Sequence, residues 1–247
     1  MSSKPQKSKI VAIFLSYNAE RTLERFYKKF PHNLVEDAIL FDDASTDRTV
    51  EIARKLGISV HRNKENLGYG GNLKGAIRQV LDQGADIIID IHPDGEYSCS
   101  SIPEAISRID GGAHLVLGNR FRTKNGPLRS GMFIWKYPVI VILNWLNGCI
   151  FGSRNIDYHS GFRAYSRNLF EQVNYEKNSN SFLFSFELIA QCLYHQLVLD
   201  DVPVDTIYTG KKRGANFRHV ARYTIGTFWT LVTFLLARSG LKCNIYR

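Results

Sequence analysis

The chain has 247 residues, 44% of them hydrophobic, which is enough to bury a core and excludes an intrinsically disordered protein. Its four cysteines are widely spaced and form no CxxC pair, so neither a zinc site nor a disulfide framework is expected. The net charge of +9 is unevenly placed, since residues 111–156 and 206–247 contain Lys and Arg but no Asp or Glu. This segregation favours an anionic partner for the second half of the chain, with a solvated basic face as the alternative.

The first half of the chain alternates apolar runs with amphipathic stretches. Residues 1–8 are polar, so we expect a short flexible leader and no secretory signal. Apolar runs typical of strands buried on both faces lie at residues 10–15, 38–41, 58–61, 86–90 and 114–118. Helical patterns lie near residues 20–29, 47–56, 72–82 and 102–109. This alternation predicts a parallel, doubly wound α/β sheet, and Ser101 with Glu104 forms a candidate capping box for the last helix.

The second half is less regular. It contains an apolar aromatic stretch, a loop, a helix and a strand, over residues 132–151, 157–167, 184–195 and 199–208 in that order. We expect one domain over residues 9–215 and an amphipathic helical tail over residues 216–247. The uncharged part of the tail, residues 223–237, would rise only about 22 Å as a helix, which is short of the roughly 30 Å hydrocarbon core. The tail is therefore not expected to span a bilayer, and both an interfacial helix and packing against the core remain open.

Polar residues follow the first two predicted strands. Ser16, Tyr17 and Asn18 come directly after the first strand, where their hydroxyl and amide groups can face a nucleotide. Asp42 and Asp43 end the second strand, and a carboxylate there can accept hydrogen bonds from a base N–H or a ribose hydroxyl. Because ligands of open α/β sheets collect beyond the carboxyl ends of the strands, these residues are candidates for a binding site.

Residues 86–97, DIIIDIHPDGEY, run from a buried strand into four titratable side chains, Asp90, His92, Asp94 and Glu96. A polar turn is one explanation, because Pro, Asp and Gly all favour turns. A metal or phosphate site at the strand end is the other. The glycines within residues 63–77, NKENLGYGGNLKGAI, do not match G-x-G-x-x-G and more simply allow a tight turn close to a ligand.

Together these segments resemble the inverting family 2 glycosyltransferases of the GT-A fold, and most closely the dolichol-phosphate mannose synthase and polyprenyl-phosphate glycosyltransferase branch. SYN resembles the family's first nucleotide-contacting turn, FDDASTDRT its VDDGSxDGT signature and NLGYGGNLKGAI its NxGxGxAxxxG helix start. DYHSGFRAYSR, residues 157–167, is similar to D-x-x-SGFRAYSR, and VPVDTIY, residues 202–208, to the following EVPV strand. The resemblance extends from about Lys9 to Gly240 and implies a Rossmann-like, mostly parallel sheet flanked by helices.

The resemblance also implies a divalent cation, Mn²⁺ or Mg²⁺. In the family the fourth strand ends in D-x-D, whose acids hold the cation against the diphosphate of a nucleotide sugar. Asp94 matches the second aspartate, whereas His92 stands in place of the first and Glu96 replaces a glutamine. Imidazole suits Mn²⁺ better than Mg²⁺, so the substitution could shift the metal preference. The alternatives for His92 are a hydrogen bond to phosphate and simple packing beside Pro93, and Asp90 is expected to be structural.

By the same resemblance, Tyr17 and Asp43 contact the nucleobase, Asp42 lies beside them, and Gly68 is near the ribose or diphosphate. Arg120, in GNR, matches the arginine of the family's GSR, which is associated with the acceptor phosphate. The further candidates for acceptor or diphosphate contacts are Arg129, Lys136, Arg163, Lys211, Lys212 and Arg213. A guanidinium suits this task because it can bond two phosphate oxygens at once.

Glu187, in FSFELIAQ, resembles the family's FDxEL helix. It is the candidate catalytic base if the acceptor is a sugar hydroxyl, because a carboxylate must then remove the proton. A lipid phosphate is already ionised and needs no base. The alternative role of Glu187 is to orient Arg163 or to cap the site.

The sequence therefore predicts an inverting, metal-dependent transfer from a UDP- or GDP-sugar to a polyprenyl or dolichyl phosphate, by a peripheral protein at the cytoplasmic face of the membrane. One alternative is transfer to a glycan hydroxyl in surface polysaccharide or lipopolysaccharide synthesis. Another is an inactive nucleotide-sugar-binding protein, because His92 and Ala19 replace acids of the family. No nucleic-acid motif is present, and the stretch over residues 132–151 could bury a homo-oligomer interface or touch lipid.

Overall fold

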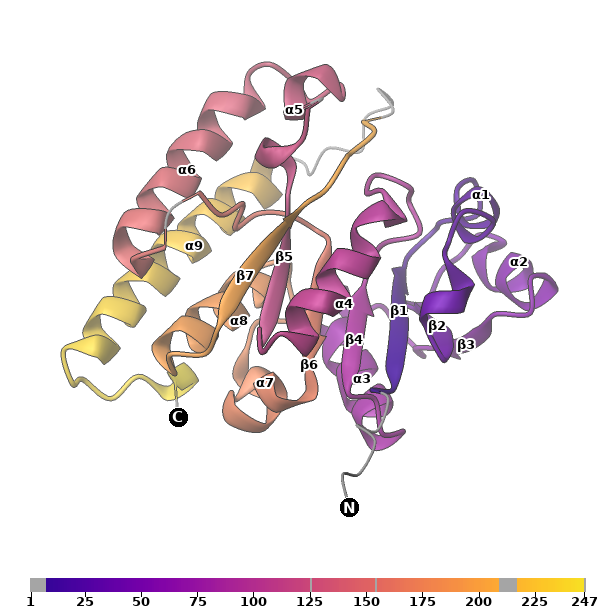
Figure 1. Ribbon diagram of the computed structural model, residues 1–247, viewed down its shortest axis with the longest axis horizontal. Helices are drawn as coiled ribbons and strands as arrows, with labels where there is room; N and C mark the ends of the chain where they lie inside the picture. The colour runs from indigo at the N-terminus through magenta and orange to yellow at the C-terminus, as the bar shows by residue number, and fades with distance from the viewer. Residues whose placement is uncertain (1–7, 125, 154, 209–216, 247) are drawn as a thin grey trace.

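The computed structural model describes residues 8–124, 126–153, 155–208 and 217–246. A seven-stranded sheet with the order β3-β2-β1-β4-β6-β5-β7 forms the centre of this part of the chain (Figure 1). The strands are β1 (Ile10–Ser16), β2 (Asp37–Asp42), β3 (Ser59–Arg62), β4 (Ile87–Asp90), β5 (Leu115–Asn119), β6 (Arg163–Ser166) and β7 (Leu199–Pro203). Neighbouring strands are parallel except that β6 runs antiparallel to both β4 and β5. The α/β prediction is confirmed, as a mixed and mostly parallel sheet.

Two strand predictions are wrong. Residues 157–167 were expected to form a loop, but β6 lies within them and is inserted between β4 and β5. The first of its four residues is a buried arginine, Arg163, so the segment lacks the apolar run that is typical of a buried strand. The run at residues 58–61 was expected to be buried on both faces, but β3 is the edge strand and exposes Ser59, His61 and Arg62.

Six helices lie within a few residues of the expected positions, whereas the helices at Gly126–Arg129, Lys136–Phe151 and Arg167–Gln172 were not predicted. In chain order the helices are α1 (Leu23–Tyr27), α2 (Thr49–Lys55), α3 (Gly68–Asp82), α4 (Ile102–Asp110), α5 (Gly126–Arg129), α6 (Lys136–Phe151), α7 (Arg167–Gln172), α8 (Phe184–Tyr194) and α9 (Phe217–Arg238). Alternate residues of β1 enter two separate cores, because successive side chains of a strand point to opposite faces. One core is covered by α3, α8 and α9, and the other by α1 and α4 (Figure 1).

The capping box predicted at Ser101 and Glu104 is absent. A 3₁₀ helix over Cys99–Ser101 runs directly into α4, so Ser101 is already helical and its side chain caps nothing. The Ser101 hydroxyl donates instead to the carbonyl of Pro203 at 2.7 Å, and Glu104 pairs with Arg108. Ser98 provides the cap one element earlier, by accepting from the amide of Ser100.

Helices α6 and α9 lie side by side on one flank of the molecule, where the rings of Phe151 and Phe234 meet at 4.9 Å (Figure 1). Their outer surface is apolar, because Ile142 and Trp145 on α6 and Trp229 on α9 are each more than 60% exposed. No helix within the described ranges is both long and apolar enough to cross a membrane. The flank is thus an exposed apolar surface formed by two helices.

Candidate active site

A cavity of about 480 Å³ opens beyond the carboxyl ends of β1, β2 and β4. Parallel strands place their carboxyl ends at one edge of the sheet, and the loops that follow them form one wall of the cavity. Ser16, Tyr17, Asp43, Gly68 and His92 all line it. The structure therefore brings together five of the residues that the sequence selected from four separate segments.

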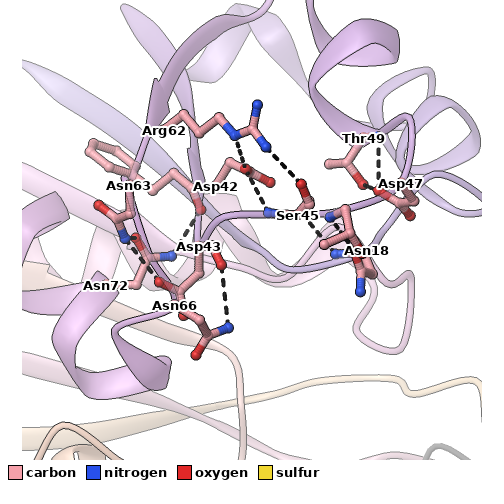
Figure 2. A network of polar contacts seen from close by, with 12 residues as sticks. Asn18, Asp42, Asp43, Ser45, Asp47, Thr49, Arg62, Asn63, Asn66 and Asn72 are labelled. Atoms are coloured by element: carbon pink, nitrogen blue, oxygen red, sulfur yellow. Dashed lines mark hydrogen bonds and ion pairs between the residues drawn. The ribbon is translucent and has the colours of Figure 1, made fainter.

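Asp43 shapes the turn that precedes α3. Its Oδ1 accepts from the side-chain amide of Asn63 at 3.0 Å and from the amide of Leu67 at 2.8 Å, and its Oδ2 accepts from the amide of Gly68 at 3.0 Å (Figure 2). Gly68 adopts a φ of +78°, which favours glycine. A carboxylate offers about four acceptor positions, so Asp43 retains one for a ligand.

Asp42 and Asn18 organise the rim and do not line the cavity. The fully buried Asp42 accepts from the amide of Ser45 at 3.0 Å and lies 3.4 Å from the guanidinium of Arg62 (Figure 2). Asn18 joins the turn after β1 to the turn after β2, because its Oδ1 accepts from the amide of Thr46 at 2.9 Å. These bonds fix the backbone that presents Tyr17 and Asp43.

The glycines at the start of α3 are explained by close packing within the chain. The amide of Gly70 donates to the carbonyl of Asn180 at 2.8 Å, and a Cβ on Gly70 would collide with Ser179 and lie 2.8 Å from Cβ of Phe184. The same carbonyl accepts from Gly71. The amides of Gly70 and Gly71 are therefore occupied by the segment that precedes α8, and Gly68 is the member of these three glycines that lines the cavity.

The turn after β4 carries the predicted metal ligands. His92 lines the cavity and stacks on Tyr69, with ring centroids 5.6 Å apart. The carboxylate of Asp94 accepts from the amide of Glu96 at 2.9 Å. Burial raises the pKa of Glu96, and the negative charge of Asp94 raises it further. No group of three or more His, Cys, Asp and Glu side chains in the described ranges could enclose a metal. Two donors suit a cation that takes its remaining ligands from substrate phosphates and water.

A buried polar chain lies behind Tyr69. Arg163 donates to the Tyr69 hydroxyl at 3.3 Å, which also bonds the Ser185 hydroxyl at 3.0 Å. Arg163 faces Asp90 across the β4–β6 pairing, and Asp90 accepts from the Tyr165 hydroxyl at 3.0 Å. Burial raises the pKa of Asp90. Arg163 is 5% exposed and does not line the cavity, so it is connected to the cavity through Tyr69.

The other predicted phosphate ligands do not gather in the cavity. Arg120 is 5% exposed and bonds both carboxylate oxygens of Asp157, at 2.6 and 2.9 Å, as well as the hydroxyl of Tyr208. Arg129 is exposed, and the ammonium of Lys136 lies over the rings of Phe133 and Trp135. Lys211, Lys212 and Arg213 lie outside the described residues.

Glu187 lies on α8, outside the cavity lining. Its carboxylate accepts from the amide of Ser179 at 2.6 Å, and so holds the segment that packs on the glycines of α3. Burial raises the pKa of Glu187, while the bond from Ser179 opposes this shift. This position matches the alternative in which Glu187 caps the site.

Sequence reasoning missed several residues of the lining. They are Asn66, Tyr69, Asn72, Ser181, Phe182, Arg222 and Tyr223. Tyr69 stands within the glycine motif, and its ring stacks on Phe182 at 5.1 Å. Tyr223 was noted only as the start of the uncharged part of the tail, and Arg222 only as one of the cations of residues 206–247. No sequence motif marks these two residues, because only the folded path of α9 brings them to the cavity.

The chain matches the family model described as "Glycosyl transferase family 2" over residues 12–173, and it belongs to that family. The protein is therefore a glycosyltransferase, as the sequence predicted. It is 29% identical over 213 residues to an uncharacterized protein of Methanocaldococcus jannaschii, which covers 85% of this chain and 87% of the relative. A UDP-N-acetylglucosamine–dolichyl-phosphate N-acetylglucosaminyltransferase of Methanococcus voltae is 23% identical, over 84% of this chain and 90% of the relative. An undecaprenyl-phosphate mannosyltransferase of Micrococcus luteus is 26% identical, over 64% and 66%.

Among solved structures, the fold resembles glucosyl-3-phosphoglycerate synthase of Mycobacterium tuberculosis in complex with UDP. The TM-score is 0.65 at 18% identity, over 96% of this chain and 82% of that one. A second structure of that enzyme, with Mn²⁺, UDP-glucose and phosphoglyceric acid, also gives a TM-score of 0.65, with coverages of 96% and 81%. The predicted GT-A fold is thereby confirmed.

Proposed function

We propose that the protein transfers a sugar, with inversion, from a UDP- or GDP-sugar to a polyprenyl or dolichyl phosphate at the cytoplasmic face of a membrane. The observation that carries this proposal is the cavity at the strand ends, which gathers five predicted donor-site residues, Ser16, Tyr17, Asp43, Gly68 and His92. Its volume of about 480 Å³ lies within the usual range of small-molecule pockets.

The nucleoside is proposed to bind against the turns after β1 and β2. Tyr17 is 54% exposed, and its ring is available to stack on a base. The remaining acceptor position of Asp43 suits a base N–H or a ribose hydroxyl. Gly68 keeps the backbone of this turn beside the cavity, because a Cβ at its φ of +78° would lie 2.7 Å from the carbonyl oxygen of Asn180.

His92 and Asp94 are proposed to hold the divalent cation together with the donor's diphosphate. An imidazole and a carboxylate are an acceptable donor pair for Mn²⁺, and the diphosphate would provide further oxygen ligands. The cation, when bound, stabilises the charge that develops on the departing nucleoside diphosphate. The role of Asp94 is supported by its place two residues after His92 in the same turn, where its carboxylate accepts from the amide of Glu96.

A phosphorylated lipid is supported as the acceptor by the names of two relatives and by the flank of α6 and α9. Both helices expose large apolar side chains, and residues 111–156 and 206–247 contain cations and no acids. Such a surface suits contact with the interface of an anionic membrane. A phosphate nucleophile is already ionised, which agrees with the position of Glu187 outside the cavity lining.

Calorimetric titration with UDP and GDP, each with Mn²⁺, Mg²⁺ or a chelator, tests the proposal. Metal-dependent binding of one nucleotide by the wild type, lost in Asp94→Ala, is the expected result. Asp110→Ala is the matched control, because Asp110 is an exposed acid at the end of α4. Transfer to farnesyl phosphate is then compared with transfer to a sugar acceptor. If neither nucleotide binds under any condition, the proposed function is wrong.

A further inference from the structure

Helix α9 contributes to the donor cavity although it lies outside the part of the chain that matches the family model, residues 12–173. Arg222 and Tyr223, in its second turn, line the cavity together with His92 and Phe182. Part of the cavity lining is thus formed by a segment to which neither the sequence motifs nor the family match assigns a role.

Arg222 is the only lysine or arginine in the cavity lining as the described residues define it. Its side chain is exposed and forms no hydrogen bond or ion pair with the part of the chain that the structure describes. The one carboxylate in the lining, Asp43, is already engaged by three hydrogen bonds. Arg222 therefore keeps its full set of guanidinium donors for a ligand.

Two other arginines that the sequence selected, both within the described residues, are already engaged. Arg120 is paired with Asp157, and Arg163 is buried behind Tyr69. The amides of Gly68, Gly70 and Gly71 donate to Asp43 and Asn180, so these three amides are not available to a phosphate. Within the part of the chain that the structure describes, Arg222 is therefore the arginine available to an anionic ligand in the cavity.

The backbone that carries Arg222 is held in place. The hydroxyl of Tyr223 bonds Nδ1 of His159 at 2.8 Å, and Nε2 of the same ring bonds the side-chain amide of Asn147 at 3.1 Å. One turn later Gly226 packs so closely on Leu183 that a Cβ would lie 2.7 Å from a methyl group. A fixed helix presents its side chain at a small cost in entropy, which favours binding.

We propose that Arg222 binds the diphosphate of the nucleotide-sugar donor, with its planar guanidinium bonding two phosphate oxygens. This inference rests on the proposed function, because it takes the nucleotide sugar as the occupant of the cavity. Arg222 is a substrate-binding residue that stays with the nucleoside diphosphate after the sugar has left. Helix α9, the outer face of which is apolar, then forms part of the donor site.

The test compares wild type, Arg222→Gln and Arg222→Lys in titrations with UDP, GDP, the corresponding nucleosides and inorganic pyrophosphate, with Mn²⁺ and with chelator. Arg222→Gln is expected to weaken nucleoside diphosphate binding about 10- to 100-fold, the usual effect of losing one charge-assisted contact, and to leave nucleoside binding unchanged. The Arg222→Lys variant should bind the nucleoside diphosphate with intermediate affinity, because an ammonium keeps the positive charge but cannot bond two oxygens in the planar geometry of a guanidinium. Arg238→Gln is the matched control, since Arg238 is exposed at the far end of the same helix.

The outcomes separate the inference from the proposed function. Wild-type binding of UDP or GDP that is unchanged in Arg222→Gln overturns the role of Arg222 and leaves the function standing. An equal loss for nucleoside and diphosphate also overturns it, because that pattern indicates a distorted cavity. If the wild type binds pyrophosphate but no nucleotide, the proposed function is wrong. In that case Arg222 keeps its role in phosphate binding only if the Arg222→Gln variant no longer binds pyrophosphate. Binding of neither overturns both.

Discussion

Replacing Arg120 with methionine decides between the two roles that this arginine has been given. The sequence motif assigns it to the acceptor phosphate, whereas in the structure it forms a buried, two-pronged pair with Asp157. Burial alone would raise the pKa of Asp157, but the adjoining Arg120 guanidinium holds that pKa below its ordinary value. Methionine keeps a long unbranched side chain and removes only the charge and the donors.

The expected effect is large because both partners are inside the protein. Arg120 is 5% exposed and Asp157 is 0% exposed, and the two bonds are 2.6 and 2.9 Å long. Removing one partner of such a pair leaves a buried charge unpaired and costs about 3–5 kcal/mol. In a protein of this size, that loss lowers the melting temperature by roughly 6–20 °C.

Urea unfolding followed by circular dichroism measures the loss, with Arg129→Met as the control because Arg129 is exposed. Arg129→Met should change the unfolding free energy by no more than about 0.5 kcal/mol. The double variant Arg120→Met with Asp157→Asn should be more stable than the sum of the single losses predicts, because it leaves no unpaired charge. If Arg120→Met unfolds within about 1 kcal/mol of wild type and loses affinity for farnesyl phosphate, the reasoning from the buried pair is wrong.

Four further predictions concern other residues. Burial lowers the pKa of His159 from 6.5 to about 4, so between these pH values the unfolded chain binds a proton at His159 and the folded chain does not. The unfolding free energy should therefore fall by about 2 kcal/mol more between pH 7 and pH 5 in wild type than in His159→Gln, and equal slopes would contradict this. Gly70→Ala should destabilise by about 1–3 kcal/mol because its Cβ meets Ser179 and Phe184, whereas Gly75→Ala on the same helix has open space around it and should be neutral or stabilising in thermal melts. Glu187→Gln still accepts the Ser179 amide and should reduce transfer to farnesyl phosphate less than about tenfold; a loss of several orders of magnitude would favour a hydroxyl acceptor. Trp145→Ser combined with Trp229→Ser should reduce sedimentation with vesicles rich in phosphatidylglycerol, and Val198→Ser, exposed but outside α6 and α9, should not.

Six of the seven strands of the sheet and most helices could be predicted, because their apolar runs are clear and their ends carry polar residues. The cavity wall formed by Ser16, Tyr17, Asp43, Gly68 and His92 followed from one rule, that loops after parallel strands meet at one edge. Which of two adjacent acids faces the cavity depends on the pleat of β2. The sequence favoured Asp43 through the family resemblance, and Asp43 is the one that lines the cavity.

The remaining features depend on contacts between distant segments. β6 escaped prediction because the strand is short and both of its end residues, the buried Arg163 and the half-buried Ser166, are polar. The engagement of Arg120 by Asp157 could not be foreseen, since 37 residues separate them and the motif names only one of the two. Arg222 was not selected as a site residue for the same reason, because its place in the cavity lining results from the path of α9.

The central position of β6 has a consequence for how the chain reaches its fold. As the protein emerges from the ribosome, β1 to β4 can pair at once, but β5 lacks its neighbour β6 until residues 163–166 appear. Until then one edge of β4 (Ile87–Asp90) is unpaired, because its partner strand β6 has not yet been synthesised. Joining the two parts of the sheet is a late, long-range step, which slows folding and exposes unpaired strand edges to other chains. Aggregation during overexpression should therefore respond more to the supply of chaperones than to changes at the cavity.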